Sequence, residues 1–95
     1  MQSDSTKLTQ KHPALTHSEF VKVVSHIQRD GKGDDREWII NTVMIEGCDT
    51  PFKFKRKQAY QKLLGARVNM TYYPTVETVA GFEMEVMTVV RIKKS

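Results

Sequence analysis

The sequence predicts a small, mainly β domain of the α+β class: a partly open antiparallel β-barrel with an N-terminal amphipathic helix and a short inserted helix. Apolar residues recur at period two in three segments after residue 37 and at helical spacing in two other segments. The 95 residues, 39% of them apolar, provide for one hydrophobic core. An open antiparallel sheet covered by one helix is the alternative that fits the same elements.

The first 13 residues are polar, lack apolar periodicity and end at His12-Pro13. We therefore expect a disordered leader at 1–13 and a single β-rich domain at 14–95. The single Cys48 cannot form an internal disulfide, and the first ten residues contain no apolar run typical of a secretion signal. We expect a cytoplasmic protein without a membrane contact.

A capping box and an apolar stripe predict a helix over residues 18–29. Thr16 and Glu19 have the spacing of the capping pair, and Leu15 and Phe20 have that of a hydrophobic staple. The stripe at i, i+3, i+4 and i+7 consists of Phe20, Val23, Val24 and Ile27. Gly31 supplies a helix stop. This helix should bury its stripe against the sheet.

Two strands are predicted next. Residues 37–47 are rich in β-branched and aromatic side chains, and one face carries Ile39, Val43 and Ile45. After a turn at 48–51 the chain alternates between apolar and basic residues, the inside-outside pattern of a strand. The alternating residues are Phe52, Lys53, Phe54 and Lys55.

The remaining residues predict a short helix and two further strands. Helical spacing returns at 59–64 before Gly65, and period-two alternation at 67–73 predicts a strand that ends at Pro74. The last segment, 76–93, alternates again, with Gly81 as a bend or hairpin turn. Met87 and Val89 interrupt its polar face, so this face is either partly covered or shifted by a bulge.

The resulting order of short or bent strands, with a helix inserted before a Gly-led strand, resembles an oligonucleotide-binding-type barrel. The resemblance is one of architecture, because the sequence has no motif specific to that family. It implies that Leu63, Leu64 and Gly65 plug one end of the barrel.

No arrangement of residues predicts an enzyme, a metal site or a cofactor. The histidines and Cys48 are scattered, and the glycine-containing segment 30–35 lacks the ligand spacing of a calcium loop. Glu83 and Glu85 share one strand face, where paired carboxylates usually form a solvated surface. We therefore expect a non-enzymatic protein.

The charge of the chain is concentrated in one stretch. Between Pro51 and Val76 there are six basic residues and no acidic one, whereas the remaining residues contain nine basic and eleven acidic ones. Such a stretch favours an anionic partner, and an outward-facing tyrosine beside it offers a stacking surface for a base. The residues predicted to bind nucleic acid are Lys53, Lys55, Arg56, Lys57, Arg67 and Tyr73.

These patterns predict a small basic binding module that contacts single-stranded nucleic acid or another polyanion. Outward lysines also protect strands from edge-to-edge aggregation, which needs no ligand. The alternative function is a protein-interaction or assembly subunit, including a homo-oligomer. It would use an apolar patch on an uncovered sheet face, formed by Trp38, Met44, Met87 and Val89.

Overall fold

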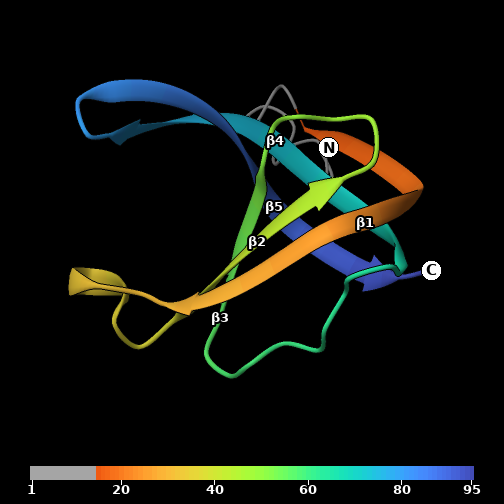
Figure 1. Ribbon diagram of the computed structural model, residues 1–95, viewed down its shortest axis with the longest axis horizontal. Helices are drawn as coiled ribbons and strands as arrows, with labels where there is room; N and C mark the ends of the chain where they lie inside the picture. Colours follow the sequence, from red (N-terminus) through yellow and green to blue (C-terminus); the bar gives the residue numbers. More distant parts are fainter. Residues whose placement is uncertain (1–14) are drawn as a thin grey trace, which may run out of the picture.

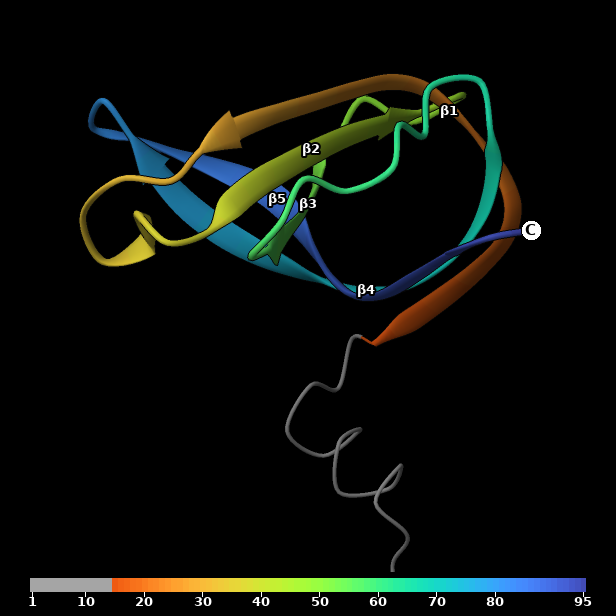
Figure 2. The ribbon, with the colours of Figure 1, turned by 90° about the horizontal axis from the view of Figure 1, so that it is seen from below.

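The computed structural model describes residues 15–95, which form a five-stranded β-barrel (Figures 1 and 2). The strands are β1 (Thr16–Asp30), β2 (Ile39–Ile45), β3 (Phe52–Arg56), β4 (Arg67–Val79) and β5 (Phe82–Lys94). One short 3₁₀ helix, η1 (Gly33–Asp35), lies between β1 and β2. The predicted leader at 1–13 lies outside the described residues.

The barrel is closed and mixed, with the strand order β1-β2-β3-β5-β4. β1 pairs with β2 along one edge and with β4 along the other, so the sheet has no gap between its first and last strands. The β3–β5 pair is parallel, and the other four pairs are antiparallel. The predictions of a partly open, wholly antiparallel barrel and of an open sheet covered by a helix are therefore wrong.

The prediction of a helix over residues 18–29 is wrong, because these residues belong to the 15-residue strand β1. Of the predicted apolar stripe only Val23 is buried, while Phe20, Val24 and Ile27 are exposed. Strand pairing on both edges satisfies the backbone here and outweighs the local helix signals. Irregularities in the register lie between Ser18 and Val21 and between Val23 and Ser25, and Phe20 has a positive φ of 57°. These bulges bend β1 around the barrel.

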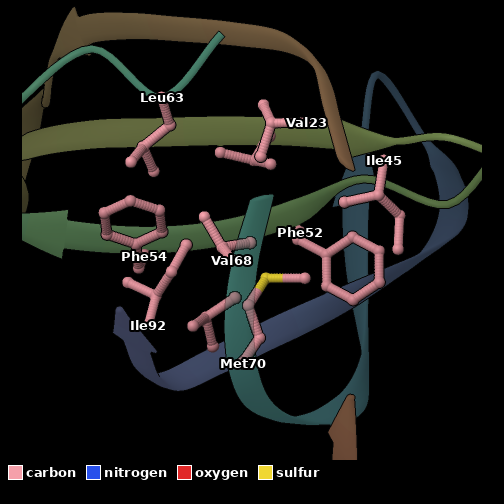
Figure 3. Close-up of a cluster of buried hydrophobic side chains, with 10 residues drawn as sticks. Val23, Ile45, Phe52, Phe54, Leu63, Val68, Met70 and Ile92 are labelled. Atoms are coloured by element: carbon pink, nitrogen blue, oxygen red, sulfur yellow. The ribbon is translucent and has the colours of Figure 1, made fainter. Parts of the chain in front are cut away.

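The core consists of inward-facing side chains from all five strands and one loop (Figure 3). The inward positions predicted for Phe52 and Phe54, and for Val43 and Ile45, are confirmed by their burial. The ring of Phe52 meets that of Tyr72 edge to face at a centroid distance of 4.8 Å. The buried members of the core are Val23, Val43, Ile45, Phe52, Phe54, Leu63, Val68, Met70, Val89 and Ile92.

The second predicted helix, at 59–64, is also absent, and residues 57–66 form a loop instead. Leu63 nevertheless plugs the barrel as expected: its side chain is fully buried and points from the loop into the core (Figure 3). Leu64 is 53% exposed. The plug therefore consists of a single side chain held by an irregular segment.

Side chains of β1 supply the hydrogen bonds that a helix would have made internally. Gln28 accepts from the backbone N–H of Tyr60 and donates to the carbonyl of the same residue, at 3.2 and 2.8 Å. The Leu63 N–H donates to Nδ1 of His26 at 3.0 Å, so Nδ1 is the acceptor of this ring and its Nε2–H donates to Oδ1 of the buried Asn41 at 2.8 Å. The loop is thereby fixed to residues more than thirty positions earlier in the chain.

β4 does not end at Pro74, in contrast to the prediction, but continues to Val79 and forms a long hairpin with β5. Pro74 is opposite Met87, whose N–H bonds to the carbonyl of Pro51 in the segment before β3, so Pro74 lies at a position without a β4–β5 hydrogen bond. Ala80 and Gly81, both at positive φ, form the two-residue turn. A bulge at Val90 shifts the parity of β5, so that Val89 and Ile92 both point into the core, whereas Val86 is buried on the opposite face of the strand.

Truncating the plug should cost far more stability than truncating its neighbour. We expect Leu63→Ala to lower the free energy of unfolding by about 2–5 kcal/mol, because it leaves a cavity in a closed core. Leu64→Ala, which truncates an exposed leucine of the same loop, is the matched control and should change little. Urea denaturation of both variants measures the difference, and equal losses would show that Leu63 is not the plug.

Candidate functional site

The outer surface of the barrel carries rows of side chains that run across the strands. The strand registers align one such row over all five strands: Ile27, Thr42, Lys53, Thr88 and Tyr73. A second row lies parallel to the first on β1, β2 and β3, two residues nearer the β1–β2 loop, and consists of Arg29, Ile40 and Lys55. Because the neighbouring residues on these strands point into the core, both rows face outward. The second row thus alternates cationic and apolar side chains, and the first row adds Lys53 beside it.

A groove of about 810 Å³ lies on this surface, between the β1–β2 loop and the β4–β5 hairpin. Its walls include Lys32 and Asp35 on one side and Glu77 on the other. The tips of both hairpins project from the same side of the barrel (Figures 1 and 2). The floor reaches Phe54 and Val89, because β3 and β5 pair over only two residue pairs.

The groove contains more cations than anions, and half of its cations are paired. Lys53 Nζ is 2.8 Å from a carboxylate oxygen of Glu77, and Lys55 Nζ is 2.7 Å from one of Asp35. No ion pair or hydrogen bond of the Arg29 or Lys32 side chain occurs within residues 15–95. The charged lining residues are Arg29, Lys32, Lys53, Lys55, Asp30, Asp35 and Glu77.

Arg56 and Lys57 lie beside the groove and stack on aromatic rings. Arg56 is on the inward parity of β3, and its guanidinium lies 4.8 Å from the ring centroid of Phe54 and 5.2 Å from that of Tyr60. It covers the end of the core beside the plug loop. The ammonium of Lys57 lies 5.3 Å from the ring centroid of Trp38. Neither residue lines the groove.

Arg67 is the first residue of β4 and thus lies at the opposite end of the β4–β5 ladder from the hairpin turn. Its guanidinium donates to the carbonyl of Phe20 at 3.1 Å and stacks 4.8 Å from the centroid of the Phe20 ring. The structure therefore divides the five cations predicted to bind nucleic acid among three places: the groove, the end of β3 and the β1–β4 seam. Only Lys53 and Lys55 share the groove.

Tyr73 faces outward on β4 in the row that contains Lys53, with Thr88 of β5 between them. The predicted outward parity of Tyr73 is thus confirmed. Tyr72, its neighbour, packs against the core and bonds through its hydroxyl to Ser18 at 2.7 Å.

The sequence prediction missed Arg29 and Lys32 in the groove, together with the exposed apolar side chains of the hairpin. Arg29 was assigned to a helix, and Lys32 to a turn without function. The signal that could have found them is their position on either side of Gly31, where a β1–β2 turn would follow a strand. Phe82 is 74% exposed and Met84 50% exposed, and both share the face of the hairpin that carries Glu77.

The apolar patch of the alternative function is not assembled as expected. Val89 is buried in the core, and Met87 packs against the core as a partly buried residue. Trp38 is half-buried beneath Lys57. Apart from Leu64 of the 57–66 loop, the large exposed apolar residues lie instead on β1 and on the β4–β5 hairpin.

Within residues 15–95, no three His, Cys, Asp or Glu side chains form a group that could hold a metal ion. The same part of the chain has no helix long and apolar enough to cross a membrane. Comparison of the chain with protein-family models, with curated proteins and with solved structures found no match in any of the three. The chemistry of the groove is therefore the basis for assigning a function.

The two ion pairs of the groove should be weak. Both are partly exposed to solvent, so a double-mutant cycle of Lys53→Met and Glu77→Gln should give a coupling energy of about 0.2–1 kcal/mol. The same cycle with Lys55→Met and Asp35→Asn should give a similar value. Denaturation midpoints measure both cycles. A coupling of several kcal/mol would mean that the lysines are committed to structure and are not available to a ligand.

Proposed function

We propose that this protein is a non-enzymatic binding module whose groove contacts single-stranded nucleic acid or another polyanion. The single observation that carries the proposal is the groove itself, which places Lys53 and Lys55 between two projecting hairpins together with Arg29 and Lys32. A row of cations that alternates with apolar side chains suits a chain of phosphates that carries flat bases.

The topology supports an oligonucleotide-binding-type barrel. In such barrels the ligand lies across strands 2 and 3, flanked by the loops between strands 1 and 2 and between strands 4 and 5. The groove here has that position: Ile40 and Lys55 come from β2 and β3, Lys32 from the β1–β2 loop, and Glu77 from the β4–β5 hairpin. A 57–66 loop instead of a helix between β3 and β4 is the difference from the expected arrangement.

Phosphate groups would compete with the carboxylates of the groove. A nucleic acid strand in the groove meets two cations without partners in the described chain and two lysines held by weak, partly exposed ion pairs. When a phosphate replaces Glu77 or Asp35 as the partner, the lysine keeps an anionic neighbour, and a carboxylate is released to solvent. The carboxylates thus lower the affinity for polyanions without preventing binding.

Aromatic and apolar side chains around the groove provide surfaces for bases. Phe82 and Met84 project from the groove face of the hairpin, and Tyr73 lies in the same outward row as Lys53. Stacking on such side chains requires unpaired bases, since those of a duplex already stack on each other. We therefore favour single-stranded over double-stranded nucleic acid.

Binding to a fluorescent single-stranded oligonucleotide should weaken steeply with salt. The log-log slope should be about −0.7 for each phosphate neutralised, because bound cations displace counterions. Lys53→Glu combined with Lys55→Glu should flatten this slope, whereas Lys62→Glu with Arg36→Glu, which reverses two exposed cations outside the groove, should change it less. Tyr73→Ala should remove about 1–3 kcal/mol through lost stacking.

Two results would contradict the proposal: no binding at low salt, or binding that is indifferent to the reversal of Lys53 and Lys55. Heparin in place of the oligonucleotide separates a general polyanion site from a nucleic acid site. If heparin binds as tightly as the oligonucleotide and Tyr73→Ala has no effect, the groove is a general polyanion site that makes no contact with bases.

Neutralising the carboxylates of the groove should strengthen binding. Glu77→Gln with Asp35→Asn frees Lys53 and Lys55 and removes two negative charges from the ligand path. We expect a lower dissociation constant for the oligonucleotide, by about tenfold at low ionic strength, and a smaller gain at high salt. Glu46→Gln with Asp49→Asn, two exposed carboxylates outside the groove, is the control. Equal gains in both double variants would show that only net charge matters.

A further inference from the structure

The β4–β5 hairpin from Pro74 to Met87, here called the arm, is acidic. Between Pro74 and Val90 the chain has three glutamates and no basic residue. Glu77 faces the groove on the outward side of the sheet, whereas Glu83 and Glu85 lie on the opposite face of the arm, opposite Thr78 and Val76 in the register. This face continues the core side of β4 and β5 beyond the barrel, and we call it the core-side face. Val76 is 63% exposed. The core-side face therefore combines two carboxylates with an exposed apolar side chain.

A surface of opposite charge lies at the other end of the same ladder. Here the outward face of β1, β4 and β5 carries four exposed cations, Lys22, Arg67, Arg91 and Lys93. Phe20, 61% exposed, is held among them by the Arg67 guanidinium and by the bond of its N–H to the Asn69 side chain. We call these five residues the seam patch. Glu19 is the one nearby carboxylate of β1, and it bonds to His17 at 3.4 Å.

The arm and the seam patch of one molecule cannot meet. Glu83 and Arg91 belong to the same strand, and eight residues of extended chain separate them by about 26 Å. Figures 1 and 2 both show the arm tip and the C-terminal end of the ladder on opposite sides of the molecule. Any contact between the two surfaces is therefore a contact between two molecules.

We infer that the core-side face of the arm docks on the seam patch of a second copy of this chain. Glu83 and Glu85 then face Arg91, Lys93 and Arg67, and Val76 covers the exposed ring of Phe20. The charges are complementary, and each surface presents one exposed apolar side chain of the kind that such a contact desolvates. The contact joins two different surfaces, so it is heterologous and produces a chain or a ring of subunits. The inference is independent of the proposed nucleic acid binding.

Sedimentation velocity of the full chain, without nucleic acid, tests the contact. The average mass should rise above that of the monomer with increasing concentration at low salt and return towards it at high salt, because exposed charge pairs are screened. Glu83→Lys with Glu85→Lys should raise the dissociation constant for self-association by about tenfold or more. Arg91→Glu with Lys93→Glu should do the same, whereas Arg36→Glu with Lys62→Glu should leave self-association unchanged.

Charge exchange gives the decisive result. Each reversed variant repels itself, but an equimolar mixture of the two places a basic arm against an acidic patch and an acidic arm against a basic patch. The mixture should therefore regain the mass of the unmodified protein. Circular dichroism establishes that both variants remain folded.

Three outcomes would overturn the inference. In the first, the unmodified protein stays monomeric at low salt. In the second, self-association is unchanged when the charges of either surface are reversed. In the third, the equimolar mixture of the two reversed variants does not self-associate. A fourth reassigns the patch: if reversal of Arg91 and Lys93 reduces oligonucleotide binding by a monomeric protein, the patch binds nucleic acid and not a second copy.

Discussion

The closure of the sheet by β1 is the constraint on which the rest of the structure depends. A five-stranded barrel leaves no edge only if its first strand pairs on both sides, and β1 does so by bending at two bulges. This closure fixes the outward rows on β2 and β3, and it leaves the β4–β5 hairpin as the element that extends beyond the barrel. The positions of the groove and of the arm both follow from it.

Residue patterns predicted the elements whose stabilising contacts are local. The alternation from Phe52 to Lys55 was visible in the sequence, and a bulge in the last strand was one of the two alternatives that its pattern allowed. The burial of Leu63 followed from the resemblance to a plugged barrel. The strand β1 was not predicted. Its helical stripe is a coincidence of spacing, and it forms a strand because it pairs with residues more than forty positions away in the sequence, such as Tyr72. The helix at 59–64 failed for a similar reason, since the bonds of this loop go to His26 and Gln28.

Only the part of the candidate site that comes from a single strand, β3, could be predicted from the sequence. Lys53 and Lys55 share a strand face, and period two alone identifies them. The carboxylates that pair with them come from η1 and β4, and no sequence pattern places Asp35 or Glu77 beside those lysines. Proximity in sequence also misled for Arg67, which lies across the barrel on Phe20. Charge density along a chain is therefore a poor guide to charge density on a surface.

The short parallel contact between β3 and β5 has a consequence for dynamics. It consists of two residue pairs, fewer than any other strand pairing of the barrel, and the groove floor lies where these two strands separate. We expect the barrel to breathe here first, with amide hydrogens near this contact exchanging more rapidly than those of the long β4–β5 ladder. A ligand that touches both Lys53 and Thr88 would hold the two strands together. Ligand binding in the groove and the equilibrium for local opening of the β3–β5 contact are then thermodynamically linked. Amide hydrogens at the groove floor should therefore exchange more slowly when the groove is occupied.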